Sequence, residues 1–127
     1  MRAIDTNVLV RLLTRDDEGQ AAAADRFIES GAWVPAPALA EATWVLEAVY
    51  NRDPVQIAVA IEMLLNHDRL TIQDADVVSA ALAHFRRRPS LGFSDCLLLE
   101  TSRKAGHTPI GTFDARFARL DGAERLR

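Results

Sequence analysis

The sequence has little cysteine and no long apolar run, and both absences restrict where the protein works. Cys96 is the single cysteine in 127 residues, so an internal disulfide is excluded and a reducing compartment is expected. No apolar run approaches the roughly 20 residues that a membrane-spanning helix needs. Arg2 and Asp5 also interrupt the N-terminus too early for the apolar core of a signal peptide. We therefore expect a cytoplasmic protein.

The chain also has no strong net charge, and a value of −3 gives no bulk indication of nucleic-acid binding. The distribution of charge says more, because every basic residue except Lys104 is an arginine. Arginine is the better side chain for bidentate contact with phosphate. The densest run, Arg86-Arg87-Arg88, is therefore a candidate RNA-binding segment, and plain solvation is the alternative explanation of such a run.

Apolar residues make up 49% of the sequence, enough for one compact domain with a sizeable core over residues 1–127. Strands are predicted at residues 2–5, 32–34, 70–72, 108–112 and 124–126. Helices are predicted from about residue 7, over 18–30 and 38–50, and after the caps Asp53, Asp74 and Ser94. This alternation predicts an α/β fold, a three-layer α/β/α sandwich with a mostly parallel central sheet.

Four acidic residues stand where the local pattern needs no charge. Asp5 closes a short apolar strand, Glu41 interrupts an almost wholly apolar helix, Asp95 opens a helix, and Asp114 follows a strand. Glu41 and Asp95 have no lysine or arginine one helical turn away, and an unpaired carboxylate is costly to bury. A divalent cation supplies the missing positive charge, and oxygen ligands suit magnesium or manganese.

Parallel-sheet topology predicts that most of these acids converge. Sites in open parallel sheets form beyond the carboxyl ends of the strands. Asp5 and Asp114 each lie at such an end, and Glu41 follows shortly after the strand at residues 32–34. Asp95 reaches the same place if its helix starts there. The pattern therefore predicts a metal-dependent hydrolase that acts on phosphodiesters.

Each acid taken alone has an ordinary alternative role. Asp5 and Asp114 are well placed to cap a helix or a turn, and Asp95 in a first turn complements the helix dipole. Glu47, in the same predicted helix as Glu41, is its nearest competitor. The remaining acids are assigned to solvated loops, caps or polar helix faces, and Glu100 is placed on a polar face.

The order of the motifs Asp5-Thr6-Asn7, Glu41, Phe93-Ser94-Asp95 and Thr112-Phe113-Asp114 resembles that of a PIN-domain ribonuclease. With its length, the chain is similar to a VapC-type toxin of a toxin–antitoxin pair, and the resemblance covers essentially the whole chain. It implies Asp5, Glu41, Asp95 and Asp114 as catalytic, metal-binding acids, with Thr6, Asn7 and Thr112 as supporting groups. It further implies Mg²⁺ or Mn²⁺ as cofactor, RNA as substrate, products with a 5′-phosphate and a 3′-hydroxyl, and a cognate VapB-type antitoxin as partner.

A homodimer is expected as well. Trp44 and Val45 lie off the predicted core stripe of Leu39, Leu46 and Val49, which leaves apolar surface on that helix. The alanine-rich helix at residues 18–30 offers a shallow surface for a partner helix, a known mode of peptide recognition.

Three alternative functions compete with this hypothesis. A metal-free ribonuclease needs two histidines as acid and base, but His67, His84 and His107 are all expected at the surface. An aspartyl-phosphate phosphatase usually has a second acid two residues after its nucleophile, where this chain has Asn7. The strongest alternative is a catalytically silent domain that binds RNA or a partner protein, and metal dependence separates it from an enzyme.

Overall fold

The computed structural model describes all 127 residues, and the chain forms two compact units, Met1–Ala75 and Asp76–Arg127. The first unit contains β1 (Arg2–Ala3), α1 (Thr6–Thr14), α2 (Glu18–Ile28), β2 (Ala32–Val34), α3 (Ala36–Ala48), α4 (Pro54–Leu65) and β3 (Leu70–Ile72). The second contains α5 (Ala75–Arg87), α6 (Phe93–Ala105), β4 (Ile110–Thr112), the 3₁₀ turn η1 (Phe117–Arg119) and β5 (Ala123–Arg125).

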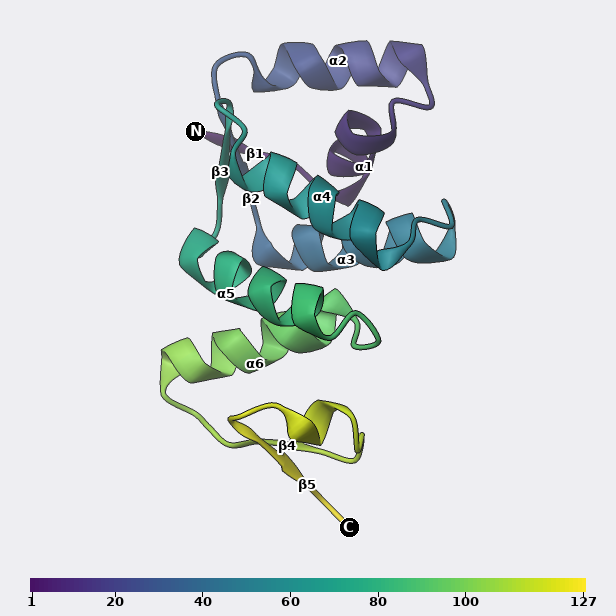
Figure 1. Cartoon of the computed structure of the whole chain (residues 1–127). Coiled ribbons are helices and arrows are strands. Elements are labelled where there is room, and N and C mark those ends of the chain that lie inside the picture. The colour runs from purple at the N-terminus through teal and green to yellow at the C-terminus, as the bar shows by residue number, and fades with distance from the viewer. The chain divides into compact units, whose positions relative to one another are not determined.

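The sheet of the first unit is parallel, and β2 lies between β1 and β3 (Figure 1). Ala32 and Val34 are fully buried while Trp33 between them is partly exposed, which is the alternation of a strand covered on one face. The amide of Ile4 donates to the carbonyl of Trp33 at 3.0 Å and extends the pairing of β1 by one residue. Asp5 therefore follows the last paired residue of the first strand.

The helices of the first unit pack through apolar faces that their sequences predict. α1 packs against α2 and α3, and α4 packs against β3 and α3. α4 begins with a complete capping box, in which Asp53 and Gln56 bond each other's backbone amides at 2.8 and 2.9 Å and Pro54 takes the first helical position. Leu9, Leu39 and Ile61 are among the most deeply buried side chains of this core.

The second unit joins two helices to a parallel strand pair, β4 and β5, near the C-terminus (Figure 1). Phe85 of α5 and Phe93 of α6 meet edge to face with ring centroids 6.0 Å apart. Gly106 ends α6 at a φ of 83°, a left-handed conformation that favours glycine. Burial raises the pKa of the Cys96 thiol to about 11, so this side chain is an inert part of the core, as predicted.

The predicted α/β/α class with parallel strands is confirmed, since every strand pair is parallel. Two local predictions were wrong. Ser94 does not cap α6, because Gly92 is the N-cap and its carbonyl accepts from the amides of Asp95 and Cys96. Val49 does not belong to the core stripe of α3, because its side chain is 62% exposed. None of the helices combines the length and the apolar character that a membrane span requires.

Candidate metal-binding acids

Asp5 caps α1 and is available for a second role. Its Oδ1 accepts a hydrogen bond from the amide of Val8 at 3.0 Å, which satisfies one of the free amides at the helix start. This bond uses one carboxylate oxygen and fixes the orientation of the other, on an exposed side chain. Capping and metal binding are therefore compatible at Asp5. Thr6 and Asn7, the predicted supporting residues, form the first turn of the same helix.

Asp5 and Asn7 also line a hollow of about 380 Å³ between α1 and α2. Its other lining residues include Arg11, Gln20 and Phe27. The Arg11 guanidinium is already occupied, because it bonds Gln20 as well as the side chains of Asp16 and Tyr50. No arginine therefore neutralises Asp5 in this hollow.

The Glu41 carboxylate is exposed on α3 and forms no hydrogen bond or ion pair within the first unit. The next two residues, Ala42 and Thr43, are buried, so Glu41 lies on the edge of the helix that faces away from the core. Its competitor Glu47 is also exposed but lies roughly 120° further round the helix at 3.6 residues per turn. The two acids therefore occupy different faces of α3.

Asp114 is close enough to Asp95 to influence it electrostatically. Burial in the first turn of α6, and then the negative charge of Asp114, raise the pKa of Asp95. Asp95 has no cationic partner. Two carboxylates that approach without a cation between them fit a divalent ion, since both offer the hard oxygen donors that Mg²⁺ and Mn²⁺ prefer.

Asp114 is held in place by the backbone that follows it. Its Oδ1 accepts from the amides of Arg116 at 2.8 Å and Phe117 at 3.3 Å, and these two bonds lower the pKa of Asp114. The Asp114 amide in turn donates to Oγ1 of Thr112 at 3.0 Å, which gives this predicted supporting residue a visible role. The carboxylate is therefore kept ionised and oriented, and its Oδ2 is left for a further ligand.

Of the four predicted acids, the structure brings Asp95 and Asp114 together within the second unit. Asp5 and Glu41 belong to the first unit, where α1 and α3 pack on each other. Neither unit contains a group of three or more histidine, cysteine or acidic side chains placed to hold a metal ion.

The second unit contains a buried charged cluster that the sequence did not reveal, and two predictions were wrong there. Glu100 is only 8% exposed rather than on a polar face, and His84 is partly buried rather than on the surface. Nε2 of His84 lies 2.6 Å from Oε1 of Glu100, and Nε of Arg103 lies 3.2 Å from Oε2. The spacing of Glu100 and Arg103 by three residues was the available signal for this cluster.

The arginine run at residues 86–88 is exposed at the C-terminal end of α5. Positive charge at this end complements the helix dipole. Arg87 folds back so that its Nε donates to the carbonyl of Ala83 at 3.3 Å. The run thus has a structural explanation that does not exclude phosphate binding.

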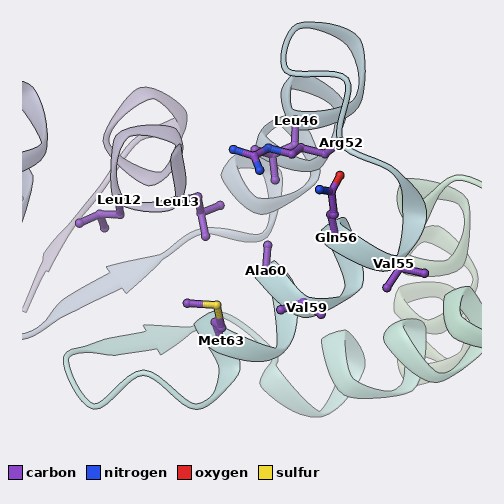
Figure 2. Close-up of a pocket in the computed structure, with 9 residues that line it drawn as sticks. All are labelled: Leu12, Leu13, Leu46, Arg52, Val55, Gln56, Val59, Ala60 and Met63. Atoms are coloured by element: carbon purple, nitrogen blue, oxygen red, sulfur yellow. The ribbon is translucent and has the colours of Figure 1, made fainter. Parts of the chain in front are cut away.

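An apolar groove of about 310 Å³ runs between α1 and α4 in the first unit, and none of the four acids lines it (Figure 2). Leu12 and Leu13 form one side, while α4 forms the other through residues that include Val59, Ala60 and Met63. Leu46 and Arg52 stand at one end. The Arg52 side chain forms no ion pair or hydrogen bond within the first unit, so the groove contains one unpaired positive charge.

Comparison with known families supports the resemblance drawn from the motifs. The model of the PIN domain matches residues 3–123, which run through both units and include all four acids. No curated protein and no solved structure matches the chain. Because the matched span covers nearly the whole sequence, the chain belongs to the PIN-domain family.

Proposed function

We propose that this protein is a metal-dependent endoribonuclease and the toxin component of a cytoplasmic toxin–antitoxin pair. PIN domains are generally nucleases and usually depend on a divalent metal ion. The observation that carries the proposal is Asp95, an acid without a cationic partner whose pKa is raised by burial and by the charge of Asp114. A cluster of like charges in an enzyme family of this kind is best explained by a cation that binds there.

We further propose that the two units work as one domain, and that Asp5, Glu41, Asp95 and Asp114 jointly hold the ion. The family match supports this, since it runs through both units. The cap bond orients the Asp5 carboxylate, and the turn after β4 orients that of Asp114. Bound Mg²⁺ or Mn²⁺ supplies an acidified water and stabilises charge on the leaving oxygen. Glu41 is exposed, so its carboxylate is available as a ligand, and Asn7 can donate a hydrogen bond to a neighbouring carboxylate.

Incubation of the purified chain with RNA and Mg²⁺, followed by analysis of the product ends, tests this function. Hydrolysis with metal is expected to leave a 5′-phosphate and a 3′-hydroxyl. A histidine-based ribonuclease instead leaves a 2′,3′-cyclic phosphate. Binding of RNA without any new ends would favour the catalytically silent alternative.

Replacing Arg86, Arg87 and Arg88 together by glutamine is expected to weaken RNA binding. Each lost phosphate contact should reduce the slope of log affinity against log salt by roughly 0.7 for single-stranded RNA. Titrations at several salt concentrations measure this slope. Arg15→Gln is the control, because Arg15 is held by Asp25 at 2.6 Å in an ion pair of the first unit. A slope that is the same in the triple variant as in the parent assigns the run to solvation.

We propose that the apolar groove receives an amphipathic helix of the antitoxin. Val55, Val59 and Met63 recur every four residues, are exposed, and so present one apolar face of α4. Arg52 at the end of the groove calls for a carboxylate on the partner (Figure 2). The partner helix should therefore carry apolar residues along one face and an acid at one end. The alanine-rich helix α2, which the sequence also offers as a surface for a partner helix, does not line this groove. Its residues Ala23 and Ala24 line the hollow between α1 and α2.

We propose that a second copy of the chain packs on a different surface, on α3. Trp44 is 64% exposed, and Val45 next to it is partly exposed. Large apolar side chains that are exposed together often mark an interface.

Light scattering of two single variants separates these contacts. The parent at micromolar concentration is expected to have the mass of two chains, and to gain mass with the small protein encoded beside it. Trp44→Glu should have the mass of one chain and still bind the partner. Val59→Glu should keep the mass of two chains and lose the partner. A parent with the mass of one chain contradicts the dimer, and a Val59→Glu chain that binds normally contradicts the groove.

A further inference from the structure

The buried cluster of the second unit connects three segments of the chain. Glu100 on α6 bonds His84 on α5 at 2.6 Å, and it accepts from Nε of Arg103 at 3.3 and 3.2 Å. A buried carboxylate is costly unless it is paired and hydrogen-bonded, and Glu100 is both. It therefore fixes the direction in which the Arg103 guanidinium points.

The other end of that guanidinium holds the chain just before β5. Nη2 of Arg103 donates to the carbonyl of Asp121 at 2.7 Å. The next residue, Gly122, has a φ of 95°, and a Cβ built there would lie 2.9 Å from the same Nη2. The close approach of arginine and backbone thus depends on a glycine at this position. Arg103 clamps this turn to α6.

The clamped turn is bonded directly to the strand that leads to Asp114. The carbonyl of Gly122 accepts from the amide of Ile110, the first residue of β4, at 2.8 Å. β4 then runs to Thr112, whose hydroxyl holds the Asp114 amide. Asp95 is on the same rigid helix as Arg103. One continuous set of hydrogen bonds therefore joins the two elements that carry the acids.

We infer that Glu100 and Arg103 are positioning residues that set the separation of the Asp95 and Asp114 carboxylates for metal binding. The inference rests on the proposed function, because that function assigns these two acids to the ion. Neither positioning residue touches the ion. They act through the placement of α6 against β4, as outer residues of metal sites act through the ligands that they orient.

Mn²⁺ affinity, measured by electron paramagnetic resonance without RNA, tests this role apart from cleavage. Arg103→Gln is expected to raise the Mn²⁺ dissociation constant roughly 10-fold or more, the scale for loss of an outer residue of a metal site. Lys104→Gln is the matched control, since it removes the same charge from the next residue of α6. It breaks the exposed pair with Asp76 at 3.1 Å and not the clamp. Its dissociation constant should stay within about 2-fold of the parent value, well below the effect of an outer residue.

Circular dichroism and melting in chelator show whether each variant is folded. Should Arg103→Gln fail to fold, Arg103→Lys replaces it, because lysine keeps the charge but cannot bridge Glu100 and Asp121 with a planar fork. A folded Arg103 variant that binds Mn²⁺ as tightly as the parent overturns the inference and leaves a purely structural role. A parent that binds Mn²⁺ but cuts no RNA defeats the proposed nuclease while the positioning role stands. A parent that binds no Mn²⁺ overturns both.

Discussion

Asp95→Asn is expected to lower the rate of RNA cleavage at least ~100-fold, and Asp5→Asn should do the same. The amide keeps the shape of the side chain but loses the charge that attracts the cation. Asp95 is the acid for which the structure gives the clearest electrostatic reason, because Asp114 is its charged neighbour and Asp95 itself has no cationic partner. Loss of Asp5 tests whether the first unit contributes to the same site.

Initial rates at saturating Mg²⁺ measure this effect, with Asp76→Asn as the matched control. Asp76 is an exposed acid of the second unit whose pKa is lowered by its bond to Lys104. The control makes the same chemical change away from the candidate site, and its rate should remain near that of the parent. If Asp95→Asn and Asp76→Asn cut equally well, the acids have been assigned to the wrong function.

The second large effect concerns stability, because Asp95→Asn should melt higher than the parent in chelator at neutral pH. The pKa of Asp95 is raised in the folded state, so the folded chain holds this proton more strongly than the unfolded chain does. The stability contributed by this group therefore falls as pH rises from the ordinary aspartate range through the raised value. At neutral pH the charged Asp95 destabilises the fold, and asparagine removes that effect.

With magnesium, the parent should melt at a higher temperature than Asp95→Asn, the reverse of their order in chelator. At about 100 times its dissociation constant, an ion that binds only the folded state adds roughly 2.7 kcal/mol, or roughly 10 °C for a chain of this size. The parent should gain this increment, and Asp95→Asn should gain much less. Melts of both proteins with chelator and with magnesium, at pH 4 and pH 7, test the two halves together.

The substitution Asp114→Asn should change the melting temperature in the opposite direction. The pKa of Asp114 is lowered by bonds from the Arg116 and Phe117 amides, so this acid stabilises the fold above the ordinary aspartate range. That contribution is lost as pH falls through the lowered value. Asp114→Asn should therefore melt lower than the parent in chelator at pH 7. If Asp95→Asn melts lower as well and keeps the full magnesium gain, Asp95 is a structural residue and not a ligand.

The sequence predicted helices and strands best where their boundaries depend on residues close together in the chain. α4 begins at Pro54 and β3 spans residues 70–72 as predicted, because a capping box and a short apolar run are local features. The start of α6 was predicted at the wrong residue, because serine is a stronger capping residue than glycine and Ser94 lies two residues after the true N-cap, Gly92. Buried Phe93 is the first residue of the helix, and the carbonyl of Gly92 accepts hydrogen bonds from the amides of Asp95 and Cys96.

The sequence indicated the candidate acids but not how each of them is held in the fold. Capping and metal binding were weighed as alternatives for Asp5 and Asp114, but the structure shows capping bonds through one oxygen of each. Those bonds are what orient the second oxygen, so the two roles support each other. The Glu100 cluster was missed because burial of an acid depends on packing between α5 and α6, which periodicity along one helix does not reveal.

Metal dependence of RNA cleavage shows whether the four acids hold a catalytic ion. The purified chain is incubated with RNA and Mg²⁺, then with excess chelator, and finally with Mg²⁺ restored above the chelator. Cleavage is expected with Mg²⁺, should stop in chelator, and should resume when Mg²⁺ is restored. The Asp5→Asn and Asp95→Asn variants should cut very little RNA under any of the three conditions. Cleavage that continues unchanged in chelator and in both variants would contradict the assignment of a metal-dependent nuclease to these four acids.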